Sequence, residues 1–530
     1  PDLLMRLAQA RQRTGDTTSA ATLLQEGREL ARASGRTADI AAIERRLGLG
    51  AFISGNPTAA LLHLDAAEES ARQARAFPLA VRSRIARAIA LLSIGRAAEG
   101  RQLIDSALSD TDLPNDPALL ARLHRAMVLL YSWTGPASIA RQHGELSLAH
   151  ASTARDPAVS WSVHWALALM AGLSGDGSAL KVHLTAAEAL ATQLRAPLLL
   201  AQSAEIAIEF ASVTGAWTDG LQLAERHIPI ARALAPHTLL PRLLVWSGIM
   251  RLERDEIDVA RAQFQEAWDI ANASTADGER VDTHVVIPAC IGLATLHLRL
   301  HNFAEAIAHA EHGLALADRL GATTWAIHRL LPILCEAHIW LNDFDRAESL
   351  ARRLREESLV LEHPLGLAYA QATEALLQRF RDGRADAHVP LVAAADRLEA
   401  IPFLFPAARL RLNAAHVLML DERNDEALQQ LRACEEAFAR MGAVRELRIV
   451  RERLRLVGSR PRRHSEFSFA ERELTTREQE IVTLVAAGKT NKEIAAALRL
   501  RVRTIDAHLR RMFAKCGVRT RAGLVGAVAR

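Results

Sequence analysis

The sequence predicts an all-α fold: a superhelical solenoid of ~40-residue helical hairpins, followed by a small four-helix domain. Hydrophobic residues make up 50% of the chain and charged residues 24%, which is ordinary for a protein with a folded core. Only 46 of the 530 residues are Gly or Pro, which favours helices over a loop-rich β fold. Turn-forming residues also recur at a constant interval, which is typical of a repeat array.

The positive charge of the chain is concentrated at its C-terminal end. Residues 471–530 contain 13 Lys and Arg against 6 Asp and Glu, a net charge of +7, whereas the preceding 470 residues carry −3. Such an asymmetry indicates a polyanionic partner for the C-terminal segment. The alternative is a basic helix face that is simply exposed to solvent.

The cysteines and the apolar runs exclude several classes of protein. The four cysteines are scattered and form no CxxC pair, which argues against a disulfide scaffold or a zinc finger and suits a reducing cytoplasm. No apolar run reaches the ~18 residues that span a bilayer, so no membrane partner is expected. No signal peptide opens the chain, and because its first residue is Pro1 rather than Met, we expect the natural start to lie upstream.

Glycines mark the repeat at intervals of 40 residues, and Asp255 continues their series. These glycines are Gly15, Gly55, Gly95, Gly135, Gly175 and Gly215. Five residues after each turn position the residue is small, with Leu180 as the exception: Ala20, Ala60, Gly100, Ala140, Gly220 and Ala260. After an insertion at ANASTADGERVD the pattern returns at Ala306, Ala347, Ala387 and Ala427.

Each unit is interpreted as a helix, a turn and a second helix. Glycine ends the first helix because it adopts a left-handed backbone at little cost, and the small residue lets the two backbones approach closely. Apolar residues then recur at helical spacing, as at Ala260, Phe264 and Ala267. Because one hairpin cannot bury its apolar face alone, about eleven units are expected to stack over residues 1–456.

One unit carries a family resemblance. Residues 245–268, VWSGIMRLERDEIDVARAQFQEAW, resemble a tetratricopeptide repeat, with Gly248, Ala260, Phe264 and Ala267 at that family's small and aromatic positions. The 40-residue period exceeds the usual 34 and predicts longer helices. The resemblance implies a concave binding surface for a partner or effector, without identifying it.

The repeat pattern ends before a short linker. Residues 457–470 include RPRRHSEFSF and read as a linker, and residues 471–530 then predict four short helices. Capping boxes at Thr475 with Glu478 and at Thr490 with Glu493 begin the first two helices. The third is expected from about Arg503 to Lys515, and Thr520 can cap the fourth. The expected apolar faces are Ile481, Val482, Leu484 and Val485, then Ile494, Ala495 and Leu498, then Ile505, Leu509 and Met512, then Leu524, Val525 and Val528.

Two short helices joined by a tight turn, the second of them basic, predict a helix-turn-helix. LTTREQEIVTLVAAGKTNKEIAAAL, followed by RTIDAHLRRMFAKCGV, resembles the LuxR-type (GerE-like) DNA-binding domain over nearly all of residues 472–530. The resemblance implies that the third helix enters the major groove of double-stranded DNA. The alternative is a structural four-helix cap on the solenoid.

The resemblance also implies roles for individual residues. Asp506, Ala507 and Arg510 are expected to meet base edges, where the acidic Asp506 either selects cytosine N4 or weakens binding. The residues expected at the DNA backbone are Lys489, Asn491, Arg503, Thr504, Arg511 and Lys515. Leu524 and Val528 are candidate contacts of a homodimer, and core packing within one subunit is the open alternative.

Three other signals are set aside. The GKT sequence at Gly488–Thr490 lacks the first glycine of a phosphate-binding loop, which is Thr483 here. Glu305, His309 and His312 share a helix face at metal-like spacing, but twenty histidines produce such groups by chance. The repeat tryptophans are expected in the core rather than stacked on an effector: Trp161, Trp165, Trp217, Trp246, Trp268, Trp325 and Trp340.

The combined architecture resembles the large bacterial regulators of the maltose-regulon-activator type, without their nucleotide-binding ATPase module. The resemblance implies promoter binding by the tail, contact with RNA polymerase, and control by a small-molecule or protein effector on the repeats. No cofactor, metal or catalytic constellation is expected. A scaffold protein whose tail is only a cap is the second hypothesis, and an enzyme is the third.

Overall fold

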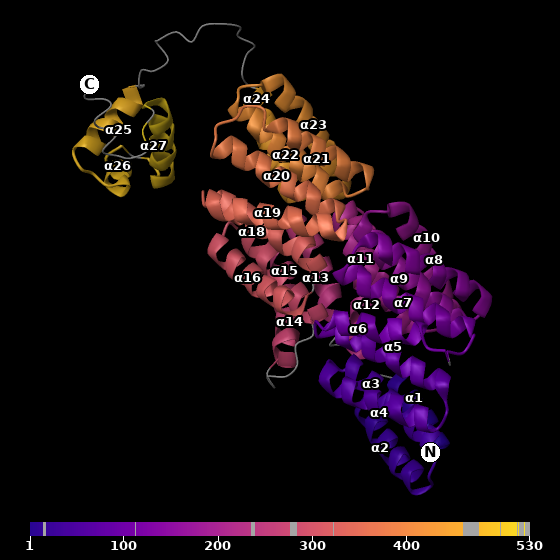
Figure 1. Ribbon diagram of the computed structural model, residues 1–530. Helices are drawn as coiled ribbons and strands as arrows, with labels where there is room; N and C mark the ends of the chain where they lie inside the picture. Colours follow the sequence, from indigo (N-terminus) through magenta and orange to yellow (C-terminus); the bar gives the residue numbers. More distant parts are fainter. Residues whose placement is uncertain are drawn as a thin grey trace. The chain divides into compact units, whose positions relative to one another are not determined.

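The computed structural model describes residues 1–13, 17–111, 113–234, 239–275, 283–321, 323–458, 476–498, 500–516, 518 and 524. The chain splits into two compact units, Pro1–Ser459 and Arg460–Arg530. Every regular element in the described residues is a helix, and the prediction of an all-α fold is confirmed (Figure 1). None of the described helices is long and apolar enough to cross a lipid bilayer.

The first unit is an array of antiparallel helix pairs, stacked in sequence order (Figure 1). Its described residues form eleven hairpins, α1–α2 to α22–α23, followed by α24; one first helix is interrupted by a π-helical turn, η1. The helices are α1 (Asp2–Arg13), α2 (Thr17–Ala33), α3 (Thr37–Ile53), α4 (Pro57–Gln73), α5 (Phe77–Ser93), α6 (Ala97–Leu108), α7 (Pro117–Thr134), α8 (Ala137–Ala154), α9 (Pro157–Ser174), α10 (Gly177–Gln193), α11 (Pro197–Thr214), α12 (Trp217–Leu234), α13 (Leu240–Glu253), α14 (Ile257–Thr275), α15 (Thr283–Arg299), α16 (Phe303–Leu320), α17 (Thr323–Trp325), η1 (Ala326–Leu330), α18 (Leu331–Trp340), α19 (Phe344–Leu361), α20 (Pro364–Phe380), α21 (His388–Ala400), α22 (Leu404–Leu420), α23 (Asn424–Met441) and α24 (Val444–Gly458).

The turns within the hairpins follow the predicted backbone geometry, with one exception. Gly175 and Gly215 have φ angles of +81° and +84°, and Asp255 takes the same left-handed conformation at +68°. Gly135 differs, because its φ is −154°. There a side chain would collide with the ring of Tyr131, so glycine is required for space rather than for backbone freedom. Gly15 lies outside the described residues.

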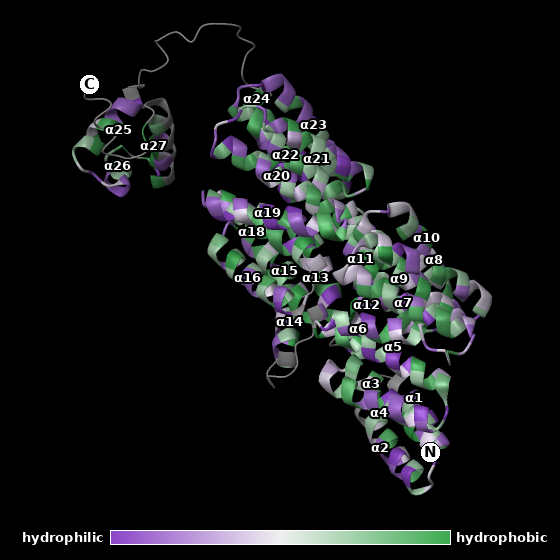
Figure 2. Cartoon of the chain, viewed as in Figure 1, coloured by the Kyte–Doolittle hydropathy of each residue, from purple (hydrophilic) through white to green (hydrophobic). Residues whose placement is uncertain are grey.

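The small residues permit close helix packing, as predicted. Each predicted alanine is fully buried or nearly so, and all but Ala387, which precedes α21 as its N-cap, lie on second helices: Ala20, Ala60, Ala140, Ala260, Ala306, Ala347, Ala387 and Ala427. A Cβ added to Gly220 would lie 2.7 Å from Cβ of Ala211, and one added to Gly100 would lie 2.9 Å from the carbonyl oxygen of Ala88. Larger side chains would therefore force the paired helices apart. Figure 2 shows hydrophobic residues on every layer of this array.

The superhelix closes on itself, so that hairpins far apart in sequence touch. Thr324 donates hydrogen bonds to the carbonyl oxygens of Ser132 and Trp133, at 3.0 and 2.9 Å. The rings of Trp133 and Trp325 meet edge to face with centroids 4.9 Å apart. These contacts, which we call the inter-turn seam, pack the second superhelical turn on the first.

A cluster of ion pairs joins five helices, with Glu253, Arg299 and Glu446 buried and Glu336 and Arg409 partly exposed. Arg299 Nε lies 2.6 Å from Glu253 Oε1, and Arg409 Nη2 lies 2.7 Å from Glu336 Oε1. Glu446 completes the cluster, at 3.5 Å from Arg409 Nε. Buried charges are stable only when they are paired, so this cluster fixes how α13, α15, α18, α22 and α24 meet.

Two expectations from the sequence concern side chains of the repeat array, namely the burial of its tryptophans and the metal-like spacing of its histidines. Trp161, Trp217, Trp246 and Trp325 are buried in the core as expected, whereas Trp340 is exposed and contradicts it. No group of three or more His, Cys, Asp or Glu among the described residues could hold a metal ion.

The second unit contains three described helices, α25 (Thr476–Ala486), α26 (Asn491–Ala497) and α27 (Val502–Cys516). They match the first three predicted helices closely. Its buried core consists of Ile481, Val482, Val485, Ile494, Ala495, Ile505, Leu509, Met512 and Leu524.

Replacing Gly172 tests the close packing directly. An alanine Cβ there would overlap the ring of Phe210, so Gly172→Ala is expected to lower the free energy of unfolding by about 1–3 kcal/mol. Gly27→Ala is the matched control, because its Cβ would lie at an ordinary contact distance of 3.4 Å from Ile43 Cδ1. Since alanine favours the helix over glycine, this variant should raise the free energy of unfolding by about 0.5–1 kcal/mol. Urea unfolding followed by circular dichroism measures both variants. Equal stability of the two would contradict the packing argument.

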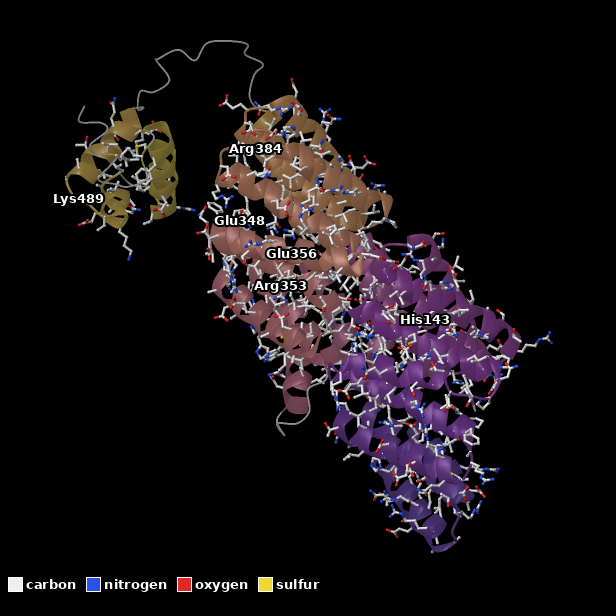
Figure 3. The ribbon with its side chains drawn as sticks, in the orientation of Figure 1. His143, Glu348, Arg353, Glu356, Arg384 and Lys489 are labelled. Atoms are coloured by element: carbon white, nitrogen blue, oxygen red, sulfur yellow. The ribbon has the colours of Figure 1, made fainter. Side chains whose placement is uncertain are left out.

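Two histidine pairs make the stability of the repeats depend on pH. Nδ1 of His124 lies 3.0 Å from Nδ1 of His143 (labelled in Figure 3), and the same contact at 2.9 Å joins His164 and His183. Burial, and then the neighbouring His143, lowers the pKa of His124 to about 4. The unfolded chain therefore binds more protons between about pH 6.5 and pH 4, and stability is lost as the pH falls through that window.

Thermal unfolding of the wild type should accordingly show a midpoint that falls between pH 7 and pH 5. The variant His124→Gln/His164→Gln cannot titrate at these positions and is expected to lose less over the same range. An identical pH dependence of the two proteins would show that the histidine pairs do not cause it.

Candidate nucleic-acid interface

The second unit is held together by a compact apolar core beneath three helices. Ile481 and Val485 on α25, Ile494 on α26 and Ile505 and Leu509 on α27 are buried against one another. The hydrophobic spacing predicted these contacts, because residues three or four apart share one face of a helix. Ala495 on α26 and Met512 on α27 complete this buried face.

The start of α26 is fixed by the predicted capping box. Glu493 Oε2 accepts a hydrogen bond of 2.7 Å from the backbone N–H of Thr490, and Thr490 Oγ1 accepts one of 3.4 Å from the backbone N–H of Glu493. The Thr490 backbone N–H also lowers the pKa of Glu493. The preceding turn is made by Gly488 at a φ of +74°. These bonds hold a helix N-terminus, with its partial positive charge, at an exposed surface.

The far end of α26 is braced by an arginine that the sequence reasoning did not single out. Arg477 Nη2 on α25 donates a hydrogen bond of 2.7 Å to the carbonyl oxygen of Leu498. Arg477 Nη1 also pairs with Glu480 at 2.5 Å. No local sequence signal identifies this contact, because Leu498 follows Arg477 by 21 residues.

A side-chain hydrogen bond joins the two helices of the helix-turn-helix. Asn491 Nδ2, at the start of α26, donates to Asp506 Oδ1 on α27 at 2.6 Å. Oδ1 of Asn491 is buried and has no hydrogen-bond partner among the described residues. One carboxylate oxygen of Asp506 is thus engaged within the protein, and Asn491 uses one of its two amide hydrogens inside the fold. The sequence analysis named both residues but not their pairing.

The other predicted DNA-contacting residues are placed as follows. Lys489 is exposed at the turn before α26 (Figure 3), and Thr504 is half-buried near the start of α27. The remaining five belong to α27, and their side chains lie outside the described part of the structure: Arg503, Ala507, Arg510, Arg511 and Lys515.

The predicted fourth helix is described at a single position. Leu524 is completely buried against the core of the unit, which favours core packing over a dimer contact at this residue. Thr475, Thr520 and Val528 lie outside the described residues.

Comparison with known families identifies this unit. Residues 472–528 match the family described as "Bacterial regulatory proteins, luxR family". The C-terminal domain of this chain is therefore a LuxR-family helix-turn-helix domain, the DNA-binding part of transcriptional regulators.

Individual relatives cover more of the chain. "Response regulator Rre1" of Synechocystis sp. is 27% identical over 196 residues, which are 37% of this chain and 75% of that protein. The solved structure of a Rap protein complexed with Competence and Sporulation Factor covers 69% of this chain and 99% of its own, with a TM-score of 0.53 and 12% identity. The apo form of RapI covers 68% of this chain and 98% of its own, at 10% identity and a TM-score of 0.41. The likeness to the first of these two structures, at a TM-score of 0.53, supports the helical-repeat fold.

The pairing of Asn491 with Asp506 predicts coupled effects on DNA binding. Asn491→Ala and Asp506→Ala should each weaken DNA binding. The affinity of the double variant for DNA should be only slightly below that of the single variant with the lower affinity. We expect a coupling energy of about 1.5–3 kcal/mol, because the bond involves a charged acceptor. Titrations of labelled duplex with the full chain measure the cycle, with the exposed Lys492→Ala as control. Additive losses, with an altered base preference for Asp506→Ala, would show that Asp506 acts on DNA independently of Asn491.

Proposed function

We propose that this chain is a bacterial transcriptional regulator in which residues 471–530 bind promoter DNA, residues 457–470 are a linker and residues 1–456 are a sensor. The match of residues 472–528 to the luxR family carries the proposal. The net charge of +7 over residues 471–530 supports it, because positive charge attracts phosphates.

Within this function, α27 is the helix that enters the major groove. Ile505, Leu509 and Met512 occupy its buried face, so the positions of Ala507 and Arg510 fall outside that face. Arg510 is proposed to pair with guanine through its planar guanidinium, and Lys489, Arg503, Thr504, Arg511 and Lys515 to contact phosphates. For Asp506 and Asn491 the 2.6 Å hydrogen bond favours holding α27 against α26 over contacting DNA.

The repeat array is proposed to bind the molecule that controls the regulator. Its fold likeness is to a Rap protein that was solved with Competence and Sporulation Factor bound, which favours a protein or peptide partner over a small molecule. Contact with RNA polymerase, action as a homodimer and a cytoplasmic location follow from the proposed role in transcription. The C-terminal unit has a buried core of its own, which argues against the scaffold hypothesis with a simple cap. We propose no enzymatic activity.

Two substitutions separate base reading from backbone binding. Arg510→Ala should cost about 1–3 kcal/mol on the preferred duplex and relax the sequence preference. Lys489→Ala should weaken binding equally on all duplexes and reduce the slope of log K against log salt by about 1. Selection of bound sequences from a random duplex library, followed by titrations at several salt concentrations, measures both effects. A uniform loss for Arg510→Ala would refute its role in reading bases.

A further inference from the structure

An exposed row of apolar side chains runs along three successive hairpins of the repeat array. Trp340, Phe380 and Leu420 are the last residues of α18, α20 and α22, and they are 53%, 38% and 47% exposed. Leu341, which follows Trp340, is 50% exposed. We call these four residues the apolar row. Exposed apolar groups at the same position of consecutive repeats mark an interaction surface more strongly than scattered ones do.

The equivalent residues of the hairpins that the second superhelical turn covers are buried, whereas Ile53, two residues before Gly55, is 36% exposed. Trp340 and Leu420 stand two residues before the left-handed residues Asn342 and Glu422. Two residues before Gly175 and Gly215, the corresponding residues are Leu173 and Val213, which are only 5% and 1% exposed. The same structural position is therefore covered in one part of the solenoid and uncovered in another.

The inter-turn seam supplies that cover. A Cβ on Gly175 would lie 3.0 Å from Ile401 Cδ1, and one on Gly215 would lie 2.7 Å from Met441 Cγ, so loops of the second turn sit on the ends of α9 and α11. Further along, Arg448 Nη2 lies 2.9 Å from Asp255 Oδ2 after α13. These covering residues come from hairpins about five units later in the array.

Among the described residues of the repeat unit, none covers the ends of α18, α20 and α22 in this way. Arg448, which covers the end of α13, already belongs to α24, and the unit closes at Ser459. A hairpin five units after α18 would be needed to reach Trp340 in the same way. The apolar row is thus the continuation of an interface that the solenoid forms with itself.

The surroundings of the row suit a self-complementary contact. The ring of Phe303 stacks on Trp340 with centroids 6.3 Å apart and an angle of 13° between planes, which holds the indole in place. The rim is charged but internally paired: Arg381 with Glu348 at 3.0 Å and Asp382 at 2.9 Å, Arg384 with Asp386 at 3.1 Å, and Arg423 with Glu426 at 2.5 Å. Figure 3 shows Glu348 and Arg384 on this part of the first unit. An apolar centre within a polar rim is the usual anatomy of a protein interface.

We propose that the apolar row joins two copies of this chain, row against row, about a two-fold axis. The balanced rim allows two identical surfaces to approach without repulsion, and aromatic anchors dominate such contacts. In a head-to-tail arrangement, the apolar row would instead meet loops of the first superhelical turn in the other copy. Those loops present the exposed residues Arg75, Arg155 and Arg195, whose charges disfavour contact with apolar side chains. The paired chains carry two helix-turn-helix domains, as an operator of two half-sites requires.

Sedimentation velocity of the full chain over a concentration series tests this proposal. The wild type should sediment as a dimer of two 57.9 kDa chains. Trp340→Glu/Phe380→Glu should raise the dimer dissociation constant at least tenfold, and circular dichroism of the same variant checks that the helices are retained. Leu62→Glu/Val182→Glu is the matched control, since these residues are 71% and 60% exposed on α4 and α10, and it should remain a dimer.

A cysteine at the centre of the row gives a second readout that does not depend on destabilising the contact. Phe380→Cys should form a disulfide-linked dimer under mild oxidation, whereas Val182→Cys should not, because a two-fold axis brings identical central residues together. A monomeric wild type, or a dimer that survives Trp340→Glu/Phe380→Glu, would overturn the proposal. DNA titrations of the same variant distinguish a failure of this proposal from a failure of the proposed function. A monomeric variant that no longer binds the full operator but still binds one half-site leaves the proposed function intact.

Discussion

The close approach of two helices within each hairpin is the constraint on which the rest of this structure depends. Small residues such as Ala260 and Gly220 bring the backbones together, and their recurrence every 40 residues gives each hairpin nearly the same geometry. Equal steps between equal units necessarily generate a superhelix. The tight pitch in turn brings the second superhelical turn onto the first, where Thr324 meets Trp133 and Met441 meets Gly215.

The same geometry explains why charge is buried inside a repeat protein. Glu253, Arg299, Glu336 and Arg409 lie where helices of both turns converge, and each is paired with an opposite charge. Such a cluster adds little to the free energy of unfolding compared with apolar packing. If the helices packed against one another in a wrong register, however, charges would be left unpaired at a cost of several kcal/mol. The cluster therefore specifies which helices meet. At the uncovered ends of α18, α20 and α22, apolar side chains take the place of such charges.

In the C-terminal domain, positioning of α27 depends on polar bonds as much as on the core. The capping box at Thr490 and the bond from Arg477 to Leu498 hold both ends of α26, and Asn491 connects α26 to α27 through Asp506. A helix that reads DNA must be held at a defined angle, because a small tilt moves its side chains away from the base edges. An acidic residue within a basic domain is thus compatible with DNA binding when its carboxylate is hydrogen-bonded inside the protein.

Much of this protein was predictable from the sequence by itself: the all-α class, the hairpin period, the buried alanines, the capping box of α26 and the LuxR-type domain. These features depend on residues close together in the chain, and helical periodicity and capping are local properties. Only the tertiary structure decided that Gly135 is needed for space beside Tyr131, that Asp506 is bonded to Asn491, and that Trp340 is exposed while Trp246 is buried. Burial of a repeat position depends on whether another turn of the superhelix reaches it. That depends on the summed geometry of about five hairpins, which no local sequence pattern encodes.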